Sequence, residues 1–148
     1  MSKPVINFED FSLPFTRSPY PEQLDDSEEQ LSNRRALATM RRAIPANVVS
    51  LGSIREMISD RPGFDCRVEE HFYLVPAPSR RYEWALIRIA WNDNDECYEW
   101  AEDARGSGFG DAKATGRALA AAMFERWEFD LTSDDYKPYR KFLKRLEK

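Results

Sequence analysis

Residues 82–91 form a stretch rich in aromatic and β-branched types, in which two interleaved rows can be read at every second position. Every second residue of a strand faces the same side, and these residue types suit a pleated, half-buried surface. We therefore predict a strand here and assign its more apolar row to the core. That row contains Ala85, Ile87, Ile89 and Trp91, and the opposite row contains Trp84, Leu86, Arg88 and Ala90.

Two further segments predict strands on either side of this one in the sequence. Residues 64–75 predict one of them, with Val68, Phe72 and Leu74 as the core candidates. Residues 92–95 consist of Asn and Asp, which favour turns, and residues 96–104 then resume a strand pattern. Because the links are short, we expect the three strands to form an antiparallel meander.

A helix is predicted to follow the third strand over residues 112–127. A glycine-rich break precedes it, and Asp111 can cap its first turn by accepting from free backbone N–H groups. Leu119, Met123 and Trp127 recur at intervals of four residues, which places them on one helical face. Small alanines beside them favour close packing of this helix on the sheet.

Helical patterns also occur on the N-terminal side of the strands. Residues 25–43 carry a Ser-x-x-Gln capping box and an apolar stripe, and Pro45 ends the pattern. Residues 47–60 predict a second, shorter helix, because Ser53 and Glu56 also fit a capping box.

The two ends of the chain differ in character. Residues 1–23 combine four prolines with aromatic residues, so we expect an extended arm that packs along the domain or docks a partner. Residues 137–147 predict an amphipathic helix with Tyr139, Phe142 and Leu146 on its apolar side. The expected fold is thus α+β: N-terminal helices, a three-stranded antiparallel sheet covered by an alanine-rich helix, and a C-terminal basic helix.

Length and charge limit the function classes. A chain of 148 residues fits one domain, here residues 24–148 after the arm, with a real hydrophobic core. The net charge of -4 weighs against a general attraction to nucleic acid or anionic membranes, although a local patch can override the global sign. The sequence shows neither a secretory leader nor a run of apolar residues that could span a bilayer, so we expect a cytoplasmic protein without membrane contact.

The residues that usually carry catalysis are sparse. His71 is the single histidine, and no serine or cysteine near it in the sequence has a triad-like context. Cys66 and Cys97 are not spaced as metal ligands. The glycines of residues 106–110 match neither a phosphate-binding loop nor the dinucleotide fingerprint. We therefore expect no enzyme activity, no catalytic residues, no cofactor and no bound metal.

Acidic residues gather along the third predicted strand and the turn before it. Their spacing does not fit a calcium-binding loop, and successive residues of a strand face opposite ways, so these acids do not converge. We interpret the run as an exposed acidic sheet edge that binds another protein. The candidate residues are Asp93, Asp95, Glu96, Glu99, Glu102 and Asp103.

Basic residues offer an alternative surface that would bind nucleic acid. They come from the loop between the first two predicted strands, from the start of the alanine-rich helix and from the polar face of the last helix. The candidate residues are Arg80, Arg81, Lys113, Arg117, Arg140, Lys141, Lys144 and Arg145.

The order of helix, three strands, glycine turn and helix over residues 50–127 resembles the double-stranded RNA-binding domain. That family has the pattern G-x-G-x-S-K-K-x-A-K-x-x-A-A at its second helix. Residues of this chain that match it, or replace it conservatively, are Gly108, Gly110, Lys113, Arg117, Ala120 and Ala121. The resemblance implies phosphate contacts by Lys113 and Arg117 across the major groove, and minor-groove contact by the loop with Arg80 and Arg81. Ala112, Ala114 and Gly116 depart from the pattern, and the loop lacks the family's Gly-Pro-x-His.

Two functions and one structural role follow. The leading hypothesis is a protein-binding inhibitor or adaptor that occludes a larger partner through its acidic surface. In general character the small acidic chain is similar to accessory proteins of phages and mobile elements, anti-CRISPR proteins among them. The alternative is binding of double-stranded RNA or other nucleic acid through the basic residues. A homodimer formed through a sheet edge or the last helix is the third hypothesis.

Overall fold

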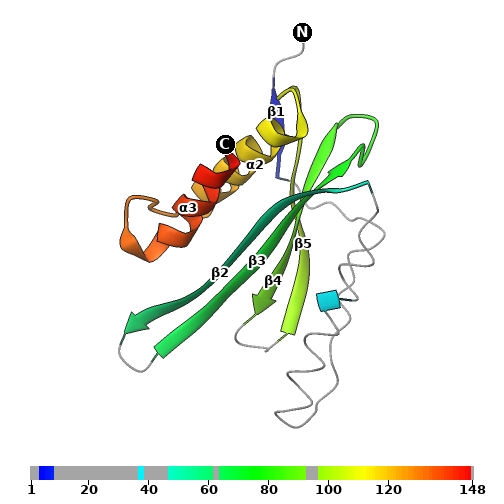
Figure 1. Cartoon of the computed structure of the whole chain (residues 1–148). Coiled ribbons are helices and arrows are strands. Elements are labelled where there is room, and N and C mark those ends of the chain that lie inside the picture. Colours follow the sequence, from blue (N-terminus) through cyan, green and yellow to red (C-terminus); the bar gives the residue numbers. More distant parts are fainter. Residues whose placement is uncertain (1–3, 9–36, 39–46, 62–63, 93–96, 148) are drawn as a thin grey trace.

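The structure is a computed structural model of the chain, and it describes residues 4–8, 37–38, 47–61, 64–92 and 97–147. Within these residues the fold is α+β, as predicted, with one antiparallel sheet and helices packed on it (Figure 1). The sheet has five strands in the order β1-β5-β4-β3-β2. They are β1 (Val5–Asn7), β2 (Val49–Arg61), β3 (Phe64–Pro76), β4 (Trp84–Asn92) and β5 (Cys97–Ser107).

The predicted meander is present as β3, β4 and β5, but the prediction of a three-stranded sheet was wrong. β1 extends the sheet beside β5, where Val5 pairs with Ser107 and Asn7 with Arg105. β1 belongs to the predicted extended arm, whose residues 9–23 lie outside the described residues. At the other side of the sheet, β2 pairs with β3 along almost its whole length.

The prediction of a helix over residues 47–60 was also wrong, because this segment forms β2. A register shift between Ser50 and Gly52 marks a bulge, where Gly52 has a φ of 101°. A bulge adds one residue to a strand and so breaks the alternation of faces. Leu51 and Ile54 consequently face the same core although they lie three residues apart, which is a helical spacing. The resemblance to the double-stranded RNA-binding domain implied a helix at this point as well.

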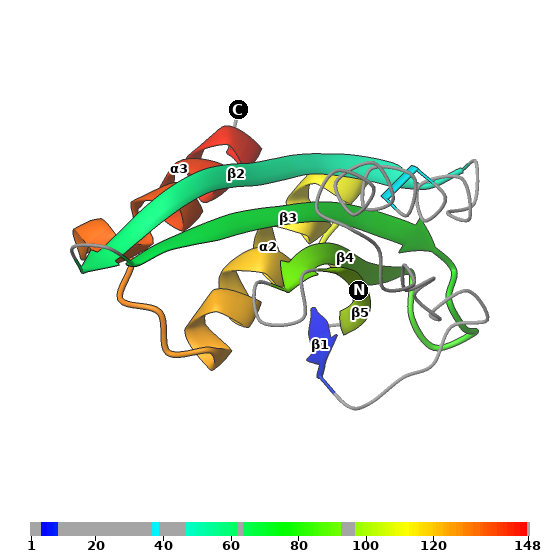
Figure 2. The same ribbon diagram turned by 90° about the horizontal axis from the view of Figure 1, so that it is seen from below.

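The predicted helices after the sheet are present. α2 (Ala112–Arg126) begins at Asp111, whose carboxylate accepts a 2.8 Å hydrogen bond from the Ala114 N–H. A short 3-10 helix, η1 (Asp134–Tyr136), leads into α3 (Lys137–Leu146). Figure 2 shows α2 and α3 on the same face of the sheet. Of the helix predicted over residues 25–43, only Leu37 and Ala38 are described, and both are helical.

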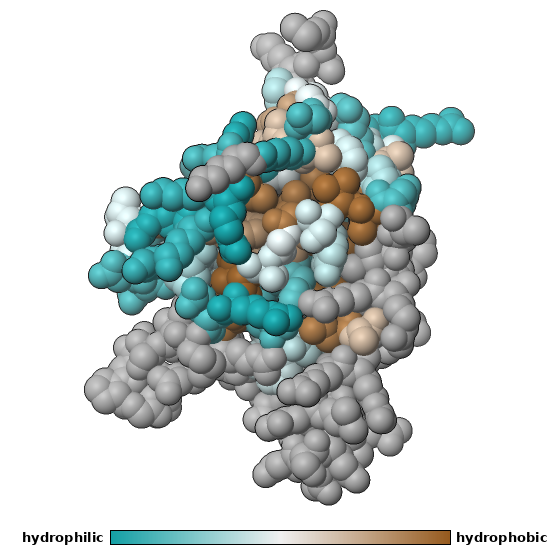
Figure 3. Space-filling model, in the orientation of Figure 1, coloured by the Kyte–Doolittle hydropathy of each residue, from teal (hydrophilic) through white to brown (hydrophobic). Residues whose placement is uncertain are grey.

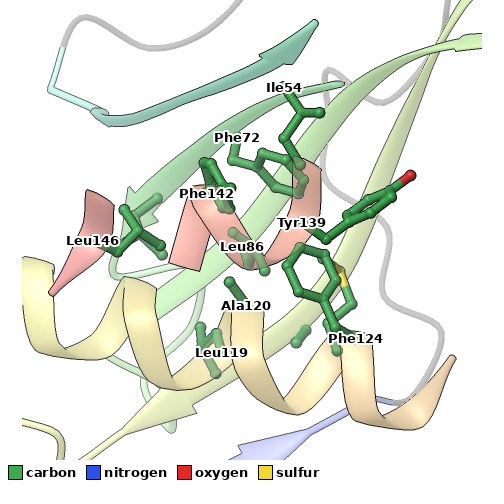
Figure 4. Close-up of a cluster of buried hydrophobic side chains, with 12 residues drawn as sticks. Ile54, Phe72, Leu86, Leu119, Ala120, Phe124, Tyr139, Phe142 and Leu146 are labelled. Carbon is green, nitrogen blue, oxygen red and sulfur yellow. The ribbon is translucent and has the colours of Figure 1, made fainter. Parts of the chain in front are cut away.

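Both faces of the sheet are buried. The face under the two helices holds the larger core, in which Phe72 of β3 meets Phe124 of α2 and Phe142 of α3 (Figure 4). The opposite face holds a second cluster, to which Leu37 contributes. The row of β4 that was predicted to face the core contributes Ala85, Ile87 and Ile89 to this second cluster. Leu86, from the opposite row, is also fully buried, because it faces the larger core under the helices.

α2 approaches β2 closely at Gly116. A Cβ atom at this position would lie 2.6 Å from Cδ2 and 2.9 Å from Cδ1 of Leu51. We expect Gly116→Val to lower the free energy of unfolding by about 1–3 kcal/mol, because the larger side chain must displace Leu51 or the helix. Denaturant unfolding of the purified variant measures this loss.

Ala121→Val is the matched control, since Ala121 lies on the exposed face of the same helix. It should cost no more than about 0.7 kcal/mol, the price of a β-branched residue in a helix. Equal losses for the two variants would mean that the close approach at Gly116 does not constrain the fold.

Candidate functional site

The polar face of α3 is strongly basic. The helix contains five cationic residues and no acidic residue between Lys137 and Leu146. Tyr139, Phe142 and Leu146 are buried against the sheet and α2, so the cations lie on the remaining face. Figure 3 shows hydrophilic residues gathered over the side of the molecule where α3 lies, with apolar residues beside them toward the middle of this face.

α3 lies against β2 and forms a groove with it. The Arg145 guanidinium donates a 2.9 Å hydrogen bond to the Ser53 carbonyl and lies 5.6 Å from the Phe142 ring centre. The hollow beside this contact has a volume of about 520 Å³. We call it the basic groove, and its lining residues are Ser53, Ile54, Arg55, Glu56, Pro138, Lys141, Lys144 and Arg145.

A second hollow lies next to the basic groove, where the start of β2, the start of α2 and the end of α3 meet. Its volume is about 420 Å³, and Arg145 lines both hollows. Most of its other walls are apolar. We call it the end pocket, and its lining residues are Val49, Ser50, Leu51, Asp111, Ala112, Lys113, Arg145 and Leu146.

The cations of the two hollows are largely free of neighbouring acids. Neither Lys141 nor Lys144 forms an ion pair with a residue that the structure describes. Arg55 lies 3.9 Å from a Glu69 oxygen, but its side chain is 61% exposed, so this pair contributes little. The Asp111 carboxylate in the end pocket already accepts from the first turn of α2.

The structure brings together only part of the predicted basic set. Lys141, Lys144 and Arg145 line the basic groove, and Lys113 joins Arg145 in the end pocket. Arg140 points elsewhere: its guanidinium donates to the carbonyls of Leu131 and Ser133, at 2.5 and 3.5 Å, and holds the loop before η1.

Arg55 is a groove residue that the sequence analysis missed. The residues around it predicted a helix, and a helix would have placed its side chain differently. The charged residues of β2 come in adjacent pairs and do not alternate with apolar residues, so no local signal indicated a strand there. Arg117, which the sequence did single out, is exposed on α2 and lines neither hollow.

Arg80 and Arg81 are exposed in the loop between β3 and β4. This loop is tied to the turn that leads into α2, because the Ser107 hydroxyl donates to the Arg81 carbonyl at 3.3 Å. The Gly108 N–H also donates to the Glu83 carboxylate at 2.9 Å. The two arginines therefore lie at the end of the molecule where α2 begins, outside the lining of either hollow (Figure 1).

The prediction of an exposed acidic edge was wrong for two of its six residues. Asp103 binds the Arg88 side chain at 2.9 Å, and only 11% of the Asp103 side chain is exposed. Glu102 binds Arg105 at 2.7 Å, and its side chain is 1% exposed. Both acids therefore neutralise buried cations and present no free carboxylate. Glu99 is half-buried, and Asp93, Asp95 and Glu96 lie outside the described residues.

A bulge in β5 places Glu102 and Arg105 on the same face of the sheet, although they lie three residues apart. The pairing of β4 with β5 shifts between Leu86 and Ile87, which leaves Asp103 without a partner residue across the ladder. Asp103 then meets Arg88, whose guanidinium also binds Glu70 at 2.8 Å and lies 4.6 Å from the Trp127 ring centre. Burial raises the pKa of the Asp103 carboxyl above its ordinary value, although the charge of Arg88 opposes this shift.

His71 lies in a separate buried cluster. Its Nε2 is 2.7 Å from the Glu69 carboxylate, which also accepts from the Tyr98 hydroxyl at 2.9 Å. The side chains of His71 and Glu69 are 4% and 6% exposed. The Glu69 carboxylate thus connects His71 of β3 with Tyr98 of β5, and His71 lies in this buried polar cluster.

The described part of the chain shows no sign of a metal site or of a membrane-spanning helix. Residues 4–8, 37–38, 47–61, 64–92 and 97–147 contain no group of three His, Cys, Asp or Glu side chains placed to hold a metal ion. None of the helices in these residues combines the length and the apolar character needed to cross a bilayer. We take the two hollows beside α3 as the candidate binding site because they bring cations from two elements together.

The composition of the hollows restricts what they can bind. Lysine and arginine side chains on two facing elements attract anions, and the apolar wall of the end pocket favours a ligand that also has an apolar part.

Comparisons of this chain with protein-family models, with curated proteins and with solved structures found no match.

Proposed function

We propose that this protein is a non-enzymatic nucleic-acid-binding module whose ligand lies in the basic groove. The observation that carries this proposal is the convergence of cations from two elements on one hollow. Lys141, Lys144 and Arg145 come from α3, and Arg55 comes from β2. Lysine and arginine are the residues that bind phosphate oxygens in protein complexes with DNA and RNA.

The net charge of -4 is compatible with this proposal because the charges are unevenly distributed. The field at a binding site depends on nearby charges, since salt screens charges more than about 8 Å away in physiological solution. Glu56 is the only acidic residue in the lining of the basic groove, against four cations. The groove therefore attracts anions although the whole chain carries a negative charge.

Protein binding through the acidic run, the leading hypothesis from the sequence, has less support. Glu102 and Asp103 are engaged in buried ion pairs, and of the other four residues only Glu99 is described. Reversing the charge of Glu99 tests this hypothesis, since a pull-down partner that survives the change would not depend on it.

Salt dependence tests the proposed function. If each of the four cations in the basic groove binds one phosphate of a single strand, affinity should fall about 50-fold between ~50 and ~200 mM salt, because phosphate binding releases condensed counterions. Lys141→Ala and Lys144→Ala should each reduce the slope of log affinity against log salt by about 0.7, the contribution of one single-strand phosphate. Fluorescence anisotropy with labelled oligonucleotides measures both quantities.

Lys137→Ala is the matched control for the two lysine variants. Lys137 is an exposed lysine of the same helix, but it lines neither hollow. Its removal changes the net charge equally and should leave the salt slope unchanged. The proposal fails if no nucleic acid binds at ~50 mM salt, or if all three lysine variants behave alike.

A further inference from the structure

We infer that the nucleic acid is bound as a single strand, with its phosphates in the basic groove and an unpaired base in the end pocket. This inference rests on the proposed function and specifies its ligand. The observation behind it is that the two hollows adjoin each other at Arg145 but differ in chemistry.

The basic groove is concave, which suits a strand better than a duplex. A duplex is read by helices, strands or loops that protrude into its own grooves. Here α3 is held against β2 by the hydrogen bond from Arg145 to the Ser53 carbonyl, and the hollow between them measures about 520 Å³. A single phosphate backbone can follow such a channel between cations, as in other proteins that bind single strands.

The end pocket provides an apolar surface that a phosphate backbone alone would not use. Val49, Leu51 and Leu146 contribute apolar side chains to it, with Lys113 and Arg145 at its edge. A base that has left the stack exposes its flat, largely apolar face and can bury it here, whereas a paired base in a duplex cannot reach a recessed pocket. The volume of about 420 Å³ is within the range of pockets that hold small organic groups.

β2 lies at the edge of the described sheet, where a peptide could bind by pairing as an additional strand. Two contacts at the start of β2 limit this mode of binding. The Gly52 N–H donates to the Ser50 hydroxyl oxygen at 3.3 Å, and the Ser53 carbonyl accepts from Arg145. These contacts occupy backbone groups at the start of β2 that an added peptide strand would need. We therefore assign ligand binding to the cations and the apolar wall of the hollows, and not to the backbone at the start of β2.

Three probes test the inference with the full chain. They are an oligothymidine of about 12 nucleotides, its duplex with oligodeoxyadenosine, and an abasic strand with the same number of phosphates. We expect the oligothymidine to bind about tenfold more tightly than either of the others, because only it combines free bases with a flexible backbone. Anisotropy at one fixed salt concentration gives the three affinities.

A substitution in the end pocket supplies the second measurement. Ala112→Glu places a carboxylate in the pocket, and an acid in the first turn is favourable for the α2 dipole, so the fold should persist. Ala121→Glu adds the same charge at an exposed position of α2 outside both hollows. We expect Ala112→Glu to weaken oligothymidine binding about tenfold and Ala121→Glu to leave it nearly unchanged. Ala112→Met, which fills the pocket without adding charge, should weaken binding in the same direction.

The outcomes separate this inference from the proposed function. Equal or tighter binding of the duplex would overturn the single-strand inference while leaving nucleic-acid binding intact. Equal binding of the abasic strand, or no effect of Ala112→Met, would overturn the base-binding role of the end pocket. Absence of binding to all three probes at ~50 mM salt would overturn the proposed function itself.

Discussion

Replacement of Arg88 by methionine is expected to lower the free energy of unfolding by about 3–5 kcal/mol at neutral pH. Arg88 binds Asp103 at 2.9 Å and Glu70 at 2.8 Å beneath the two helices. Methionine fills much of the same space but leaves both carboxylates buried without a cation. Among the described residues, one buried Glu70 oxygen accepts no hydrogen bond of good geometry, so Arg88 is the group that neutralises this carboxylate. Urea or guanidinium unfolding measures the loss.

The loss of unfolding free energy caused by Arg88→Met should become smaller as the pH falls from about 7 to about 5. Burial already raises the pKa of Asp103, and Arg88 is the group that opposes this rise, so its removal raises the pKa further. A carboxyl with a higher pKa in the folded state binds its proton more tightly there. Its charge therefore costs stability at pH values above the folded pKa, and that cost disappears as the pH falls through the folded pKa toward the ordinary value. A deficit that does not change with pH would contradict this account.

Two variants control for the size and charge of the side chain. Arg117→Met makes the same change at an exposed position of α2 and should alter the free energy of unfolding by no more than about 0.5 kcal/mol. The combination of Arg88→Met with Asp103→Asn removes one of the stranded charges, so it should be less destabilised than Arg88→Met alone. If the double variant is the less stable, the cluster is not held by charge neutralisation.

Truncation of Phe124 to alanine is expected to cost about 3–5 kcal/mol of unfolding free energy. Phe124 is fully buried in α2, and its ring contacts Phe72 of β3 and Phe142 of α3 in edge-on arrangements, with centroids 6.3 Å apart in both cases. Its loss leaves a cavity where the sheet and both helices meet (Figure 4). Thermal and denaturant unfolding measure the change.

Phe124→Leu is the control for this core variant, because leucine restores most of the lost volume but not the aromatic contacts. Its loss of stability should be clearly smaller than that of Phe124→Ala. Neither variant alters a residue that lines the basic groove or the end pocket. Under conditions where both remain folded, they should therefore keep the nucleic-acid affinity of the parent chain. A selective loss of affinity would show that the groove depends on how the core positions α3.

The sequence by itself determined those elements whose signals are local. β3, β4 and α3 followed from the periodicity of apolar residues, and α2 followed from its capping residue and its row at every fourth position. These patterns can be recognised in a single sequence because each depends only on the geometry of one helix or strand. The basic face of α3 was equally readable, since the buried side of an amphipathic helix defines its other side.

The tertiary structure decided the features that depend on pairing between strands. Residues 47–60 contain a capping-box pattern and, at the bulge near Gly52, a helical spacing of apolar residues, so the pairing of β2 with β3 could not be read from them alone. That pairing is also what brings Arg55 beside α3 and forms the basic groove. In the same way, a second bulge and the partners across the sheet decided that Glu102 and Asp103 are buried in ion pairs. The sequence shows where an Asp or Glu occurs, but only the packed structure determines whether its carboxylate faces water or a buried cation.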